Sequence, residues 1–508
     1  MEEAISAPRA TLRDILLLAY DANMPVDILK RELTRDTKCA MWLEQQRIML
    51  EVLQLLTMEP QSSAPMDPEY GAYRVQHFCC EIALWYPRRT FQRKGARDVD
   101  LSASAPFWKA LFEFVCTTNA LDDVLVVLFC KVVNHFVLNH RFGPVMLEFF
   151  ASEGQNIVPW LVRHMDSDSI RDMLVWLLYS DLTEVGQQHV WKSRFWEHLL
   201  TNLHEWQRLL SYGEGTSFHR DAINNICALL KYVVCPPAIY VVEGGATFVE
   251  SANDPLLPLI TDPYVPSQHN ELLKSLLLFF RTTSHITFGT LVDLGFTELV
   301  RQSTQQCAFL LQDGGSLSVV MNIVRLLGYQ KRQRDNTGIK TLLEQTKSAL
   351  LQDLAPRLPK FVQLAHAVIE KDEEQMRQVG HFPQNQRIRL QTKGLALHYL
   401  IAFLKLCVLM QDACVNEVLA EFGLMPCLLD CYSAYPTNSL LHHELTDVIR
   451  FVLMDPDQKR SPTCPLLQSL FVEPANLLDF VIKKYADPTV QYKGHLTTIA
   501  NSIITLTT

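Results

Sequence analysis

Hydrophobic residues recur at helical spacing along nearly the whole chain. In the clearest stretch, residues 121–139, apolar side chains follow one another at intervals of three and four. This spacing places them on one face of an α-helix. Additional apolar residues widen the face, as expected for a helix that neighbours cover on more than one side. The face consists of Leu121, Val124, Leu125, Leu128, Phe129, Val132, Val133 and Phe136, widened by Val126, Val127 and Val137.

Helix boundaries can also be predicted. Pro106 is expected at the first helical position of the segment PFWKALFEFV, and Ser167 or Asp168 is expected to cap the helix IRDMLVWLL. Runs of alternating polar and apolar residues are rare. The best strand candidate, AIYVVEGG from Ala238, has no evident partner strand in the sequence. The pattern therefore predicts an all-α fold.

Two segments share an arrangement of helix, glycine and helix, one centred on Gly295 and the other on Gly423. Glycine suits a left-handed turn that ends one helix and leads into the next. Loosely repeated helix pairs of this kind are typical of HEAT and armadillo repeats. We therefore expect a HEAT/armadillo-like helical-repeat solenoid.

Three stretches interrupt the helical pattern. Residues 235–267 are rich in proline and predict a long loop, and residues 372–393 and 455–465 are expected to form exposed loops. None of the three resembles a domain linker. The chain is predicted to be one domain, residues 1–508, with an N-terminal half 1–234, the proline-rich loop 235–267 and a C-terminal half 268–508.

The chain has 508 residues and a net charge of −9 at pH 7. This sign disfavours a general binder of nucleic acid or of anionic membranes. A short basic run at Lys331, Arg332 and Arg334 has acidic neighbours and is more typical of a solvated loop. Composition and charge therefore argue against nucleic acid as the partner.

The thirteen cysteines form no CxxC motif, which argues against a disulfide framework or a zinc ribbon. The start MEEAISAPR lacks the cationic and apolar regions of a signal peptide. We expect a cytoplasmic protein that is also present in the nucleus. Residues 394–410 approach the length of a membrane span, but His398 and Lys405 inside them favour a buried helix and no membrane span.

Catalytic motifs are absent from the sequence. It contains no P-loop, GxSxG elbow or HExxH motif, and Gly213 and Gly215 predict an ordinary loop before a helix. His442, His443 and Glu444 match half of a metalloprotease motif, but Asp447 occupies the place of the second zinc-binding histidine. The favoured interpretation is a helix whose histidines bond to neighbouring backbone or carboxylates. Cys427 and Cys431, four residues apart, are interpreted in the same way as buried packing residues.

Three aspartates cluster in RHMDSDSIRDM: Asp166, Asp168 and Asp172. Paired carboxylates serve in acid–base catalysis or metal binding. Acidic residues also suit the first turn of a helix, and Asp172 is placed to pair with Arg171 or Arg163. The structural interpretation is favoured, and no catalytic, cofactor-binding or metal-binding residue is predicted.

The segment YKGHLTTIAN at Tyr492–Asn501 resembles the closing motif of the SAPS family, the regulatory subunits that bind protein phosphatase 6 and its fungal counterpart. In that motif a tyrosine shortly precedes Gly-His-Leu-Thr and an Ile-Ala pair. The matching positions are Gly494, His495, Leu496, Thr497, Ile499 and Ala500.

A second segment, PCLLDCYSAYPTNSLLH, is similar to the aromatic-rich segment of the same family. Its matching positions are Leu429, Asp430, Tyr435, Asn438, Leu441 and His442. Weaker matches follow the family's order upstream, so the resemblance extends from about Cys80 to the end. They are CEIAL at Cys80–Leu84, LFCKV at Leu128–Val132, LVRHMDSDSIRDML at Leu161–Leu174, and FHRDAINNIC with His219, Ala222 and Cys227.

The sequence departs from the family in several places. Asp166–Ser169 stand where the family has Gly-Thr-Ser-Ala, Ser439 follows Asn438 where a second asparagine is usual, and the Phe-Trp-rich opening is absent. These departures affect residues that the resemblance would assign to phosphatase contacts.

The motif residues also have structural interpretations. Gly494 is expected to let the chain turn sharply into a helix in which Ile499, Ile503 and Ile504 pack on the preceding repeat. The polar residues near the second segment are expected either to hold an inter-helix turn by hydrogen bonds, which is favoured, or to contact a partner. The candidate partner-binding or motif residues are His219, Asp430, Tyr435, Asn438, His442, Tyr492, Gly494 and His495.

Together, pattern and resemblance imply a non-enzymatic scaffold that binds a protein phosphatase 6-type catalytic subunit and modulates its activity or targeting. A further ankyrin-type or substrate-recruiting subunit is a second expected partner. The alternatives are a general armadillo-like adaptor with a non-phosphatase partner and an enzyme whose active site the sequence does not reveal.

Overall fold

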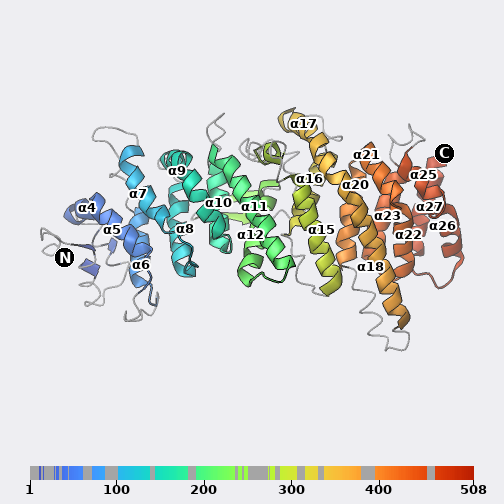
Figure 1. Ribbon diagram of the computed structural model, residues 1–508, viewed down its shortest axis with the longest axis horizontal. Coiled ribbons are helices and arrows are strands. Elements are labelled where there is room, and N and C mark those ends of the chain that lie inside the picture. Colours follow the sequence, from blue (N-terminus) through green and yellow to red (C-terminus); the bar gives the residue numbers. More distant parts are fainter. Residues whose placement is uncertain are drawn as a thin grey trace. The chain divides into compact units, whose positions relative to one another are not determined.

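The structure is a computed structural model, and its described part consists almost entirely of α-helices (Figure 1). The all-helical class predicted from the sequence is confirmed for this part, apart from one β-hairpin. The described residues are 11, 12, 15, 16, 28, 30, 31, 33, 37–43, 45–60, 71–85, 101–137, 143–180, 190–234, 238–242, 245–249, 273, 275–280, 287–305, 315–329, 337–378, 395–454 and 464–507.

The chain divides into two compact units. Unit 1 comprises residues 1–229 and 266–275, and unit 2 comprises residues 230–265 and 276–508. The predicted division into halves at residues 234 and 268 stays a prediction. The helices of unit 1 are α4 (Thr37–Leu43), α5 (Gln46–Leu56), α6 (Arg74–Trp85), α7 (Leu101–Glu113), α8 (Asp123–Val137), α9 (Gly143–Arg163), α10 (Asp168–Ser180), α11 (Val190–Ser211) and most of α12 (Ser217–Val234).

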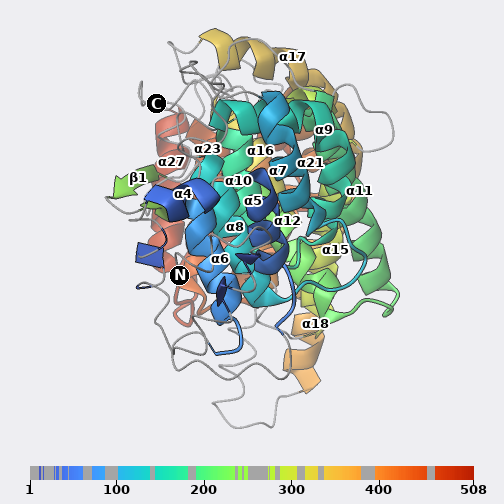
Figure 2. The same ribbon diagram turned by 90° about the vertical axis from the view of Figure 1, so that its left-hand side faces the viewer.

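Helices two apart in the sequence pack side by side in unit 1. One row contains α6, α8 and α10, and a second row contains α5, α7, α9 and α11. In Figure 2, α9 and α11 lie to the right of α6, α8 and α10. Aromatic rings fill the space between the rows: Trp108 of α7 contacts Phe136 of α8 edge to face, with ring centroids 4.9 Å apart. Unit 1 is therefore a two-row helical stack with a continuous core.

Unit 2 contains the hairpin and the remaining helices. Its elements are β1 (Ala238–Val242), β2 (Gly245–Val249), α15 (Phe288–Gln305), α16 (Ser316–Tyr329), α17 (Thr337–Leu354), the 3₁₀ turn η3 (Ala355–Arg357), α18 (Leu358–Gln378), α20 (Leu395–Leu409), α21 (Ala413–Glu421), α22 (Leu424–Ala434), α23 (Ser439–Met454), α25 (Pro465–Phe471), α26 (Leu477–Ala486) and α27 (Lys493–Thr507). Successive packing contacts join α16, α20, α23 and α27 in one row and α15, α18, α22 and α25 in another.

Residues 123–137 of the amphipathic stretch form α8, as predicted. Its buried side chains include Leu125, Leu128, Phe129 and Phe136. Val127 is an exception: it was expected to widen the apolar face, but 52% of it is exposed. Val127 lies on the solvent-exposed side of α8, outside the face that the buried residues form.

Two helix starts were predicted, and the structure supports one of them. Helix α10 begins at Asp168, and the carbonyl oxygen of Ser167 accepts a hydrogen bond from the Arg171 backbone N–H at 3.1 Å. The start at Pro106 is wrong, because α7 begins at Leu101 and contains Pro106. Pro106 lacks only one backbone hydrogen bond near the start of the helix, so the preceding residues can still form its first turn.

The two glycines that were predicted to separate helices behave differently. Gly423 lies between α21 and α22 with a left-handed φ of 78°, as predicted. Gly295 lies inside α15, so the predicted turn there is wrong. A Cβ atom at residue 295 would approach the Leu317 Cα to 3.0 Å. Glycine is required at this position because α15 and α16 pack closely.

The isolated strand does have a partner, contrary to the prediction. β1 pairs with β2 in an antiparallel hairpin whose register runs from Ala238 opposite Val249 to Val242 opposite Gly245. Antiparallel strands joined by a two-residue connection need no crossover, so a short segment supplies its own partner. The hairpin lies inside the predicted proline-rich loop, most of which falls outside the described residues.

The predicted loop at residues 372–393 is wrong for its first part, because α18 continues to Gln378. This part is charged but rich in Glu, Lys, Gln and Arg, which are good helix formers. Residues 379–393 lie outside the described part, as do 455–463 of the third predicted loop. Pro465, the last residue of that loop, is the first residue of α25, a position that proline favours.

The apolar stretch at residues 394–410 forms α20, which packs against α16 and α23. Lys405 forms ion pairs with Glu444 and Asp447 of α23. Among the helices of the described ranges, none combines the length and the apolar character that crossing a membrane requires.

Candidate functional site

The residues of the SAPS-like motifs meet in what we call the aromatic cluster, where α22, α23 and the start of α27 join. The rings of Tyr432 and His442 stack with centroids 4.9 Å apart, and the Tyr492 ring lies 4.9 Å from that of His442. His495 contacts His442 at 5.6 Å. The cluster consists of Tyr432, His442, Thr446, Tyr492 and His495.

Hydrogen bonds bind the same cluster together. The Thr446 hydroxyl lies 2.6 Å from the Tyr432 hydroxyl and 2.9 Å from His495 Nδ1, and it donates to the His442 carbonyl oxygen at 2.6 Å. Buried polar groups in one network strengthen one another and fix a single packing arrangement. The two motif segments are thus joined through side chains of three helices.

His442 is almost completely buried, with 2% exposed. Burial, together with the neighbouring His495, lowers its pKa to about 4, although a hydrogen bond to the Tyr435 backbone opposes the shift. The imidazole is therefore neutral near pH 7 and acts as a packing group. Its Nε2 atom has no hydrogen-bond partner within the described part of the chain.

Two of the candidate residues in the second motif segment hold inter-helix contacts. The buried Tyr435 donates a hydrogen bond from its hydroxyl to Asp372 Oδ2 of α18 at 2.6 Å. Asn438 precedes α23, and its Oδ1 accepts from the Leu441 backbone N–H at 3.1 Å, which caps the helix. Asp430 is exposed on α22. The hydrogen-bonding interpretation is confirmed for Tyr435 and Asn438, whereas contact with a partner stays a prediction.

Gly494 does not form the sharp turn that was expected. It lies inside the first turn of α27, and a Cβ atom there would meet no atom within 4 Å. Ile499 is buried as expected, but 58% of Ile504 is exposed. Its packing was predicted from spacing alone, and the buried arc of α27 does not include residue 504.

His219 acts at the start of α12. Its Nδ1 accepts a hydrogen bond from the Thr216 backbone N–H at 3.1 Å and lies 3.0 Å from the Thr216 hydroxyl. The ring also contacts Phe218 edge to face. His219 therefore caps the helix locally, a contact that was not predicted.

The weaker motif matches lie against one another in unit 1. Glu81 of the CEIAL segment in α6 forms an ion pair with Lys131 of the LFCKV segment in α8 at 2.9 Å, and also with Lys30. The Cys80 thiol donates to the Leu128 carbonyl oxygen at 3.9 Å. These two segments thus form the contact between neighbouring helices of one row.

The next two segments form a similar contact. Arg171 of α10 donates to the Asn225 side-chain oxygen of α12 at 2.8 Å. The same guanidinium pairs with Asp168 at 3.0 Å and with Asp172 at 2.8 Å. The predicted pairing of Asp172 with Arg171 is confirmed, and Asp168 and Asp172 are accounted for by a structural network.

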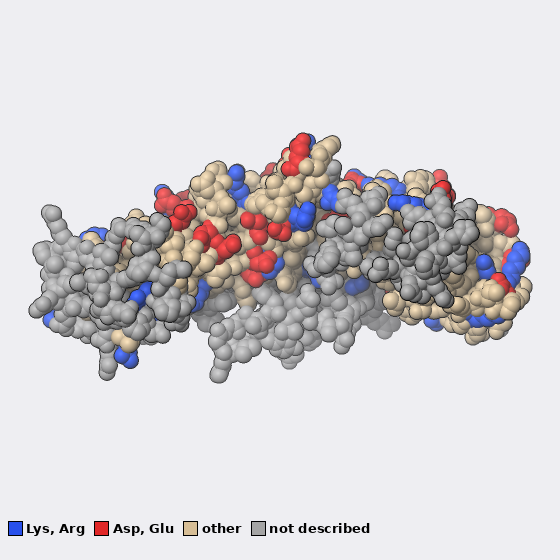
Figure 3. Space-filling view, turned by 90° about the horizontal axis from the view of Figure 1, so that it is seen from below, with Lys and Arg blue, Asp and Glu red and all other residues tan. Residues whose placement is uncertain are grey.

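Acidic side chains gather on part of the molecular face shown in Figure 3. In unit 1 the carboxylate of Asp166 lies close enough to Asp123 and Asp221 for both to act on its charge. Asp166 is exposed, but neighbouring residues partly desolvate its carboxylate and raise its pKa, and repulsion from Asp123 and Asp221 contributes to the rise. Asp122 has a different role, because its Oδ1 caps α8 by accepting from the Val124 and Leu125 N–H groups.

Changing Asp166 to Asn is expected to stabilise the protein slightly at pH 7. A raised pKa means that the folded state penalises the ionised form, so this penalty applies above the folded pKa and vanishes below the unfolded value of about 4. The gain should not exceed about 0.5 kcal/mol because the side chain is exposed. Urea unfolding at pH 7 and pH 4 measures it.

The control for that substitution is Asp168→Asn. It removes a carboxylate that pairs with Arg171, so it should not stabilise the protein. A gain for Asp166→Asn that persists unchanged at pH 4 would contradict the electrostatic explanation.

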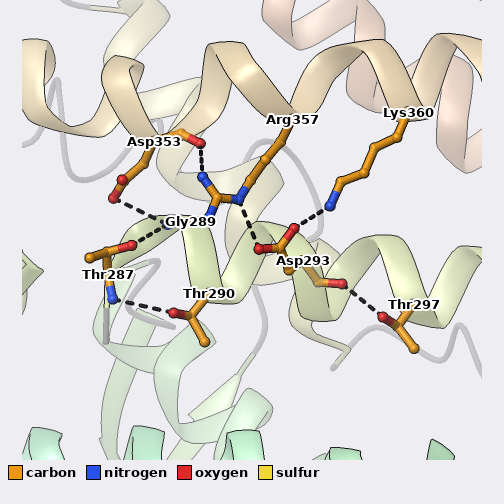
Figure 4. A network of polar contacts seen from close by, with 8 residues as sticks. All are labelled: Thr287, Gly289, Thr290, Asp293, Thr297, Asp353, Arg357 and Lys360. Atoms are coloured by element: carbon orange, nitrogen blue, oxygen red, sulfur yellow. Dashed lines mark hydrogen bonds and ion pairs between the residues drawn. The ribbon is translucent and has the colours of Figure 1, made fainter. Parts of the chain in front are cut away.

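A polar network in unit 2 was missed by sequence reasoning (Figure 4). Asp293 of α15 accepts from Arg357 Nε at 2.8 Å and from Lys360 Nζ. Arg357 also donates to the Asp353 carbonyl oxygen at 2.7 Å, and Asp353 Oδ2 accepts from the Gly289 N–H at 3.2 Å. The network ties α15 to the junction of α17, η3 and α18. The residues that link α15 to this junction are more than sixty residues apart in the sequence, so no local pattern indicates the link.

Glu298 of α15 makes a second contact that the sequence did not indicate. Its carboxylate accepts from the Ser316 and Leu317 backbone N–H groups at 2.9 and 3.2 Å, and burial raises its pKa. These N–H groups belong to the first turn of α16, which has no intrahelical partners for them. Glu298 is thus a helix cap supplied by a neighbouring helix.

The remaining candidates for chemistry do not form a site within the described residues. Cys427 and Cys431 are free, buried cysteines of α22, and a hydrogen bond joins their thiols. His443 is exposed and lies 3.7 Å from Asp447. No group of three potential metal ligands occurs among the residues that the structure describes. Lys331, Arg332 and Arg334 lie outside them.

A search of curated proteins finds no match for this chain. The family model SAPS, described as SIT4 phosphatase-associated protein, matches residues 414–508. This range contains the aromatic cluster, Asp430, Tyr435 and Asn438. The SAPS resemblance predicted from the sequence is therefore confirmed over residues 414–508, and the family is one of phosphatase-associated regulatory subunits.

Proposed function

We propose that the protein is a regulatory scaffold subunit that binds a protein phosphatase 6-type catalytic subunit and modulates its activity or targeting. The observation that carries this proposal is the SAPS family match at residues 414–508. The network around Thr446 supports it, because the motif residues are built into one rigid corner of three helices.

The proposed architecture is a HEAT/armadillo-like solenoid. Its support is the packing of helices two apart in the sequence within each unit, which gives two rows. Stacked helix pairs offer extended surfaces for other proteins. Holding a phosphatase and a substrate on one scaffold raises their effective concentration, so specificity arises without a catalytic group on the scaffold.

The candidate residues would contribute in two ways. Asp430 is exposed on α22 and is placed to touch a partner directly. Tyr435, His442 and Tyr492 are buried, so they would act by fixing the shape of the surface. The proposed location is cytoplasmic and also nuclear, and an ankyrin-type or substrate-recruiting subunit is the proposed additional partner.

Binding to a purified protein phosphatase 6-type catalytic subunit tests the proposal. The full chain is immobilised, and the phosphatase is passed over it at micromolar concentrations in a biolayer interferometry experiment. We expect saturable binding that Asp430→Arg weakens by about tenfold, since an exposed charge reversal at an interface opposes the original complementarity. The control is Glu113→Arg, an exposed charge reversal on α7 in unit 1.

Folding of each variant is checked by circular dichroism. A folded protein that shows no phosphatase binding at micromolar concentrations would refute the proposal. It would favour the second candidate, a general armadillo-like adaptor with a non-phosphatase partner. The helical packing alone supports that candidate equally well, and the family match favours the first.

A further inference from the structure

Helix α26 presents an apolar stripe to solvent. Leu478, Ile482 and Tyr485 follow one another at intervals of four and three, so they lie on one face of the helix. Their exposed fractions are 48%, 67% and 52%. The adjacent face is covered: Leu477 and Val481 are buried, and α26 packs against α25 and α27. Helix α26 is thus apolar on both faces, and one of them is exposed.

Exposed apolar side chains are common singly, but three in register on one helix form a contiguous surface. This spacing is the one that a partner helix uses to dock, because side chains at i, i+4 and i+7 interdigitate with those of a facing helix. The stripe therefore fits a helix laid along α26.

Lys493 borders the stripe. Its ammonium group lies 5.6 Å from the centroid of the Tyr485 ring. Lys493 is the first residue of α27, and the first turn of α27 contains no acidic residue. A cation at a helix N-terminus opposes the helix dipole, so this lysine does not stabilise its own helix. Its charge acts instead on the Tyr485 ring and on the Asp487 carboxylate.

The acidic groups around the stripe are already engaged within the protein. Asp479 pairs with Lys483 at 3.3 Å. Asp487 accepts hydrogen bonds from the Thr489 N–H at 2.9 Å and from the Thr489 hydroxyl at 2.7 Å. These two hydrogen bonds, assisted by Lys484 and Lys493, lower the pKa of Asp487. Asp487 stays ionised, and Lys484 and Lys493 act on its charge. Residues 477–494 hold three lysines and two aspartates, so the net charge beside the stripe is positive.

We propose that the α26 stripe is a docking surface for an amphipathic helix of a partner protein, with apolar residues at i, i+4 and i+7 and acidic residues beside them. The apolar residues pack against Leu478, Ile482 and Tyr485. The acidic residues face Lys493, which lies against the Tyr485 ring. Gly494 leaves open space next to Lys493, where no side chain obstructs the partner. The surface does not depend on which phosphatase the protein binds.

Two labelled synthetic peptides test this proposal by fluorescence anisotropy with the full chain. Each is a helix of about 18 residues with leucines at i, i+4, i+7 and i+11, the anchor spacing of helix-in-groove binding. One carries glutamates beside the leucines, and the other carries lysines at the same positions. We expect the glutamate peptide to bind at least about tenfold more tightly, because its charges complement the lysines of the surface.

Substitutions locate the binding. Ile482→Asp is expected to weaken the glutamate peptide by about tenfold or more, since it removes the central apolar contact and adds repulsion. Lys493→Glu should reduce the preference for glutamate over lysine. The matched control is Val127→Asp, a similar change at an exposed apolar residue of α8 in unit 1. Since all of these side chains are exposed or half-exposed, the variants should fold, and circular dichroism checks that they do.

Several outcomes would overturn the proposal. These are equal binding of the two peptides, no binding up to millimolar concentration, or equal weakening by Val127→Asp. Sedimentation velocity tests whether the protein associates with itself. If it does, and Ile482→Asp abolishes the association, then the stripe binds a second copy of this chain and not a partner helix. The protein is also mixed with vesicles of anionic lipid. Vesicle binding that Ile482→Asp abolishes, together with no peptide binding, would show that the stripe binds membranes and not a partner helix. None of these results bears on phosphatase binding, which is measured separately.

Discussion

Replacing Gly295 by leucine is expected to lower the free energy of unfolding by about 2–3 kcal/mol, because overpacking costs more than the gain in helix propensity of about 1 kcal/mol returns. A Cβ atom at this position would approach the Leu317 Cα to 3.0 Å and the Leu317 backbone nitrogen to 3.2 Å. These are backbone atoms of α16, which cannot rotate away as a side chain does. Helices α15 and α16 would have to separate.

Urea unfolding followed by circular dichroism measures this effect, and Gly494→Ala is the control. Residue 494 also lies in a helix, but an added Cβ atom there meets nothing within 4 Å. Gly494→Ala should therefore leave the stability unchanged or raise it slightly. Equal stability of Gly295→Leu and the unsubstituted protein would show that α15 and α16 are not held as closely as described.

The second large effect is expected from Lys405→Ala. Lys405 Nζ lies 2.8 Å from Glu444 Oε2 and 2.9 Å from Asp447 Oδ2, and each of the three side chains is less than one third exposed. Removing the lysine leaves two half-buried carboxylates on successive turns of α23 without a counterion. We expect a loss of about 2–4 kcal/mol, at or below the range for breaking a buried pair.

The pH dependence provides the measurement. Burial lowers the pKa of Lys405, but the hydrogen bonds to Glu444 and Asp447 outweigh it, and the net shift is upward. The stabilisation is therefore complete below the unfolded pKa of about 10.4 and is lost as the pH rises through the folded value. The destabilisation by Lys405→Ala should therefore be fully present at pH 7 and should shrink as the pH rises through the folded pKa of Lys405.

A rescue variant separates charge from packing. Adding Glu444→Gln and Asp447→Asn to Lys405→Ala removes both uncompensated carboxylates and should restore more than half of the lost stability. No restoration would mean that the aliphatic part of the lysine, packed in α20, accounts for the effect.

Glycine shows where sequence reasoning reached its limit. Gly295 and Gly423 occur in similar helix–glycine–helix patterns, yet Gly423 has a positive φ between two helices and Gly295 lies inside one. Both a left-handed turn and a close helix contact require the absence of a Cβ atom. The local pattern therefore cannot distinguish them.

The candidate site shows a similar division. The motif residues around His442 and Tyr492 were found by resemblance, and the expectation that polar groups there hold helices together is confirmed for Tyr435 and Asn438. The partner of Tyr435, Asp372, is sixty-three residues away in the sequence. It was assigned to an exposed loop because its neighbours are charged, and no local signal linked it to α22.

The sequence by itself determined the helical class, the position of α8, the start of α10, the turn at Gly423 and the resemblance that the family match confirms at residues 414–508. Each of these depends on residues within a few turns of one another, because an α-helix is closed by hydrogen bonds over four residues. The tertiary structure decided the partners of Asp293, Glu298 and Lys405 and the exposure of the α26 stripe. These contacts and this exposure depend on which helices lie side by side. The spacing of apolar residues along one helix shows that a face is apolar, but it does not show whether another helix covers that face.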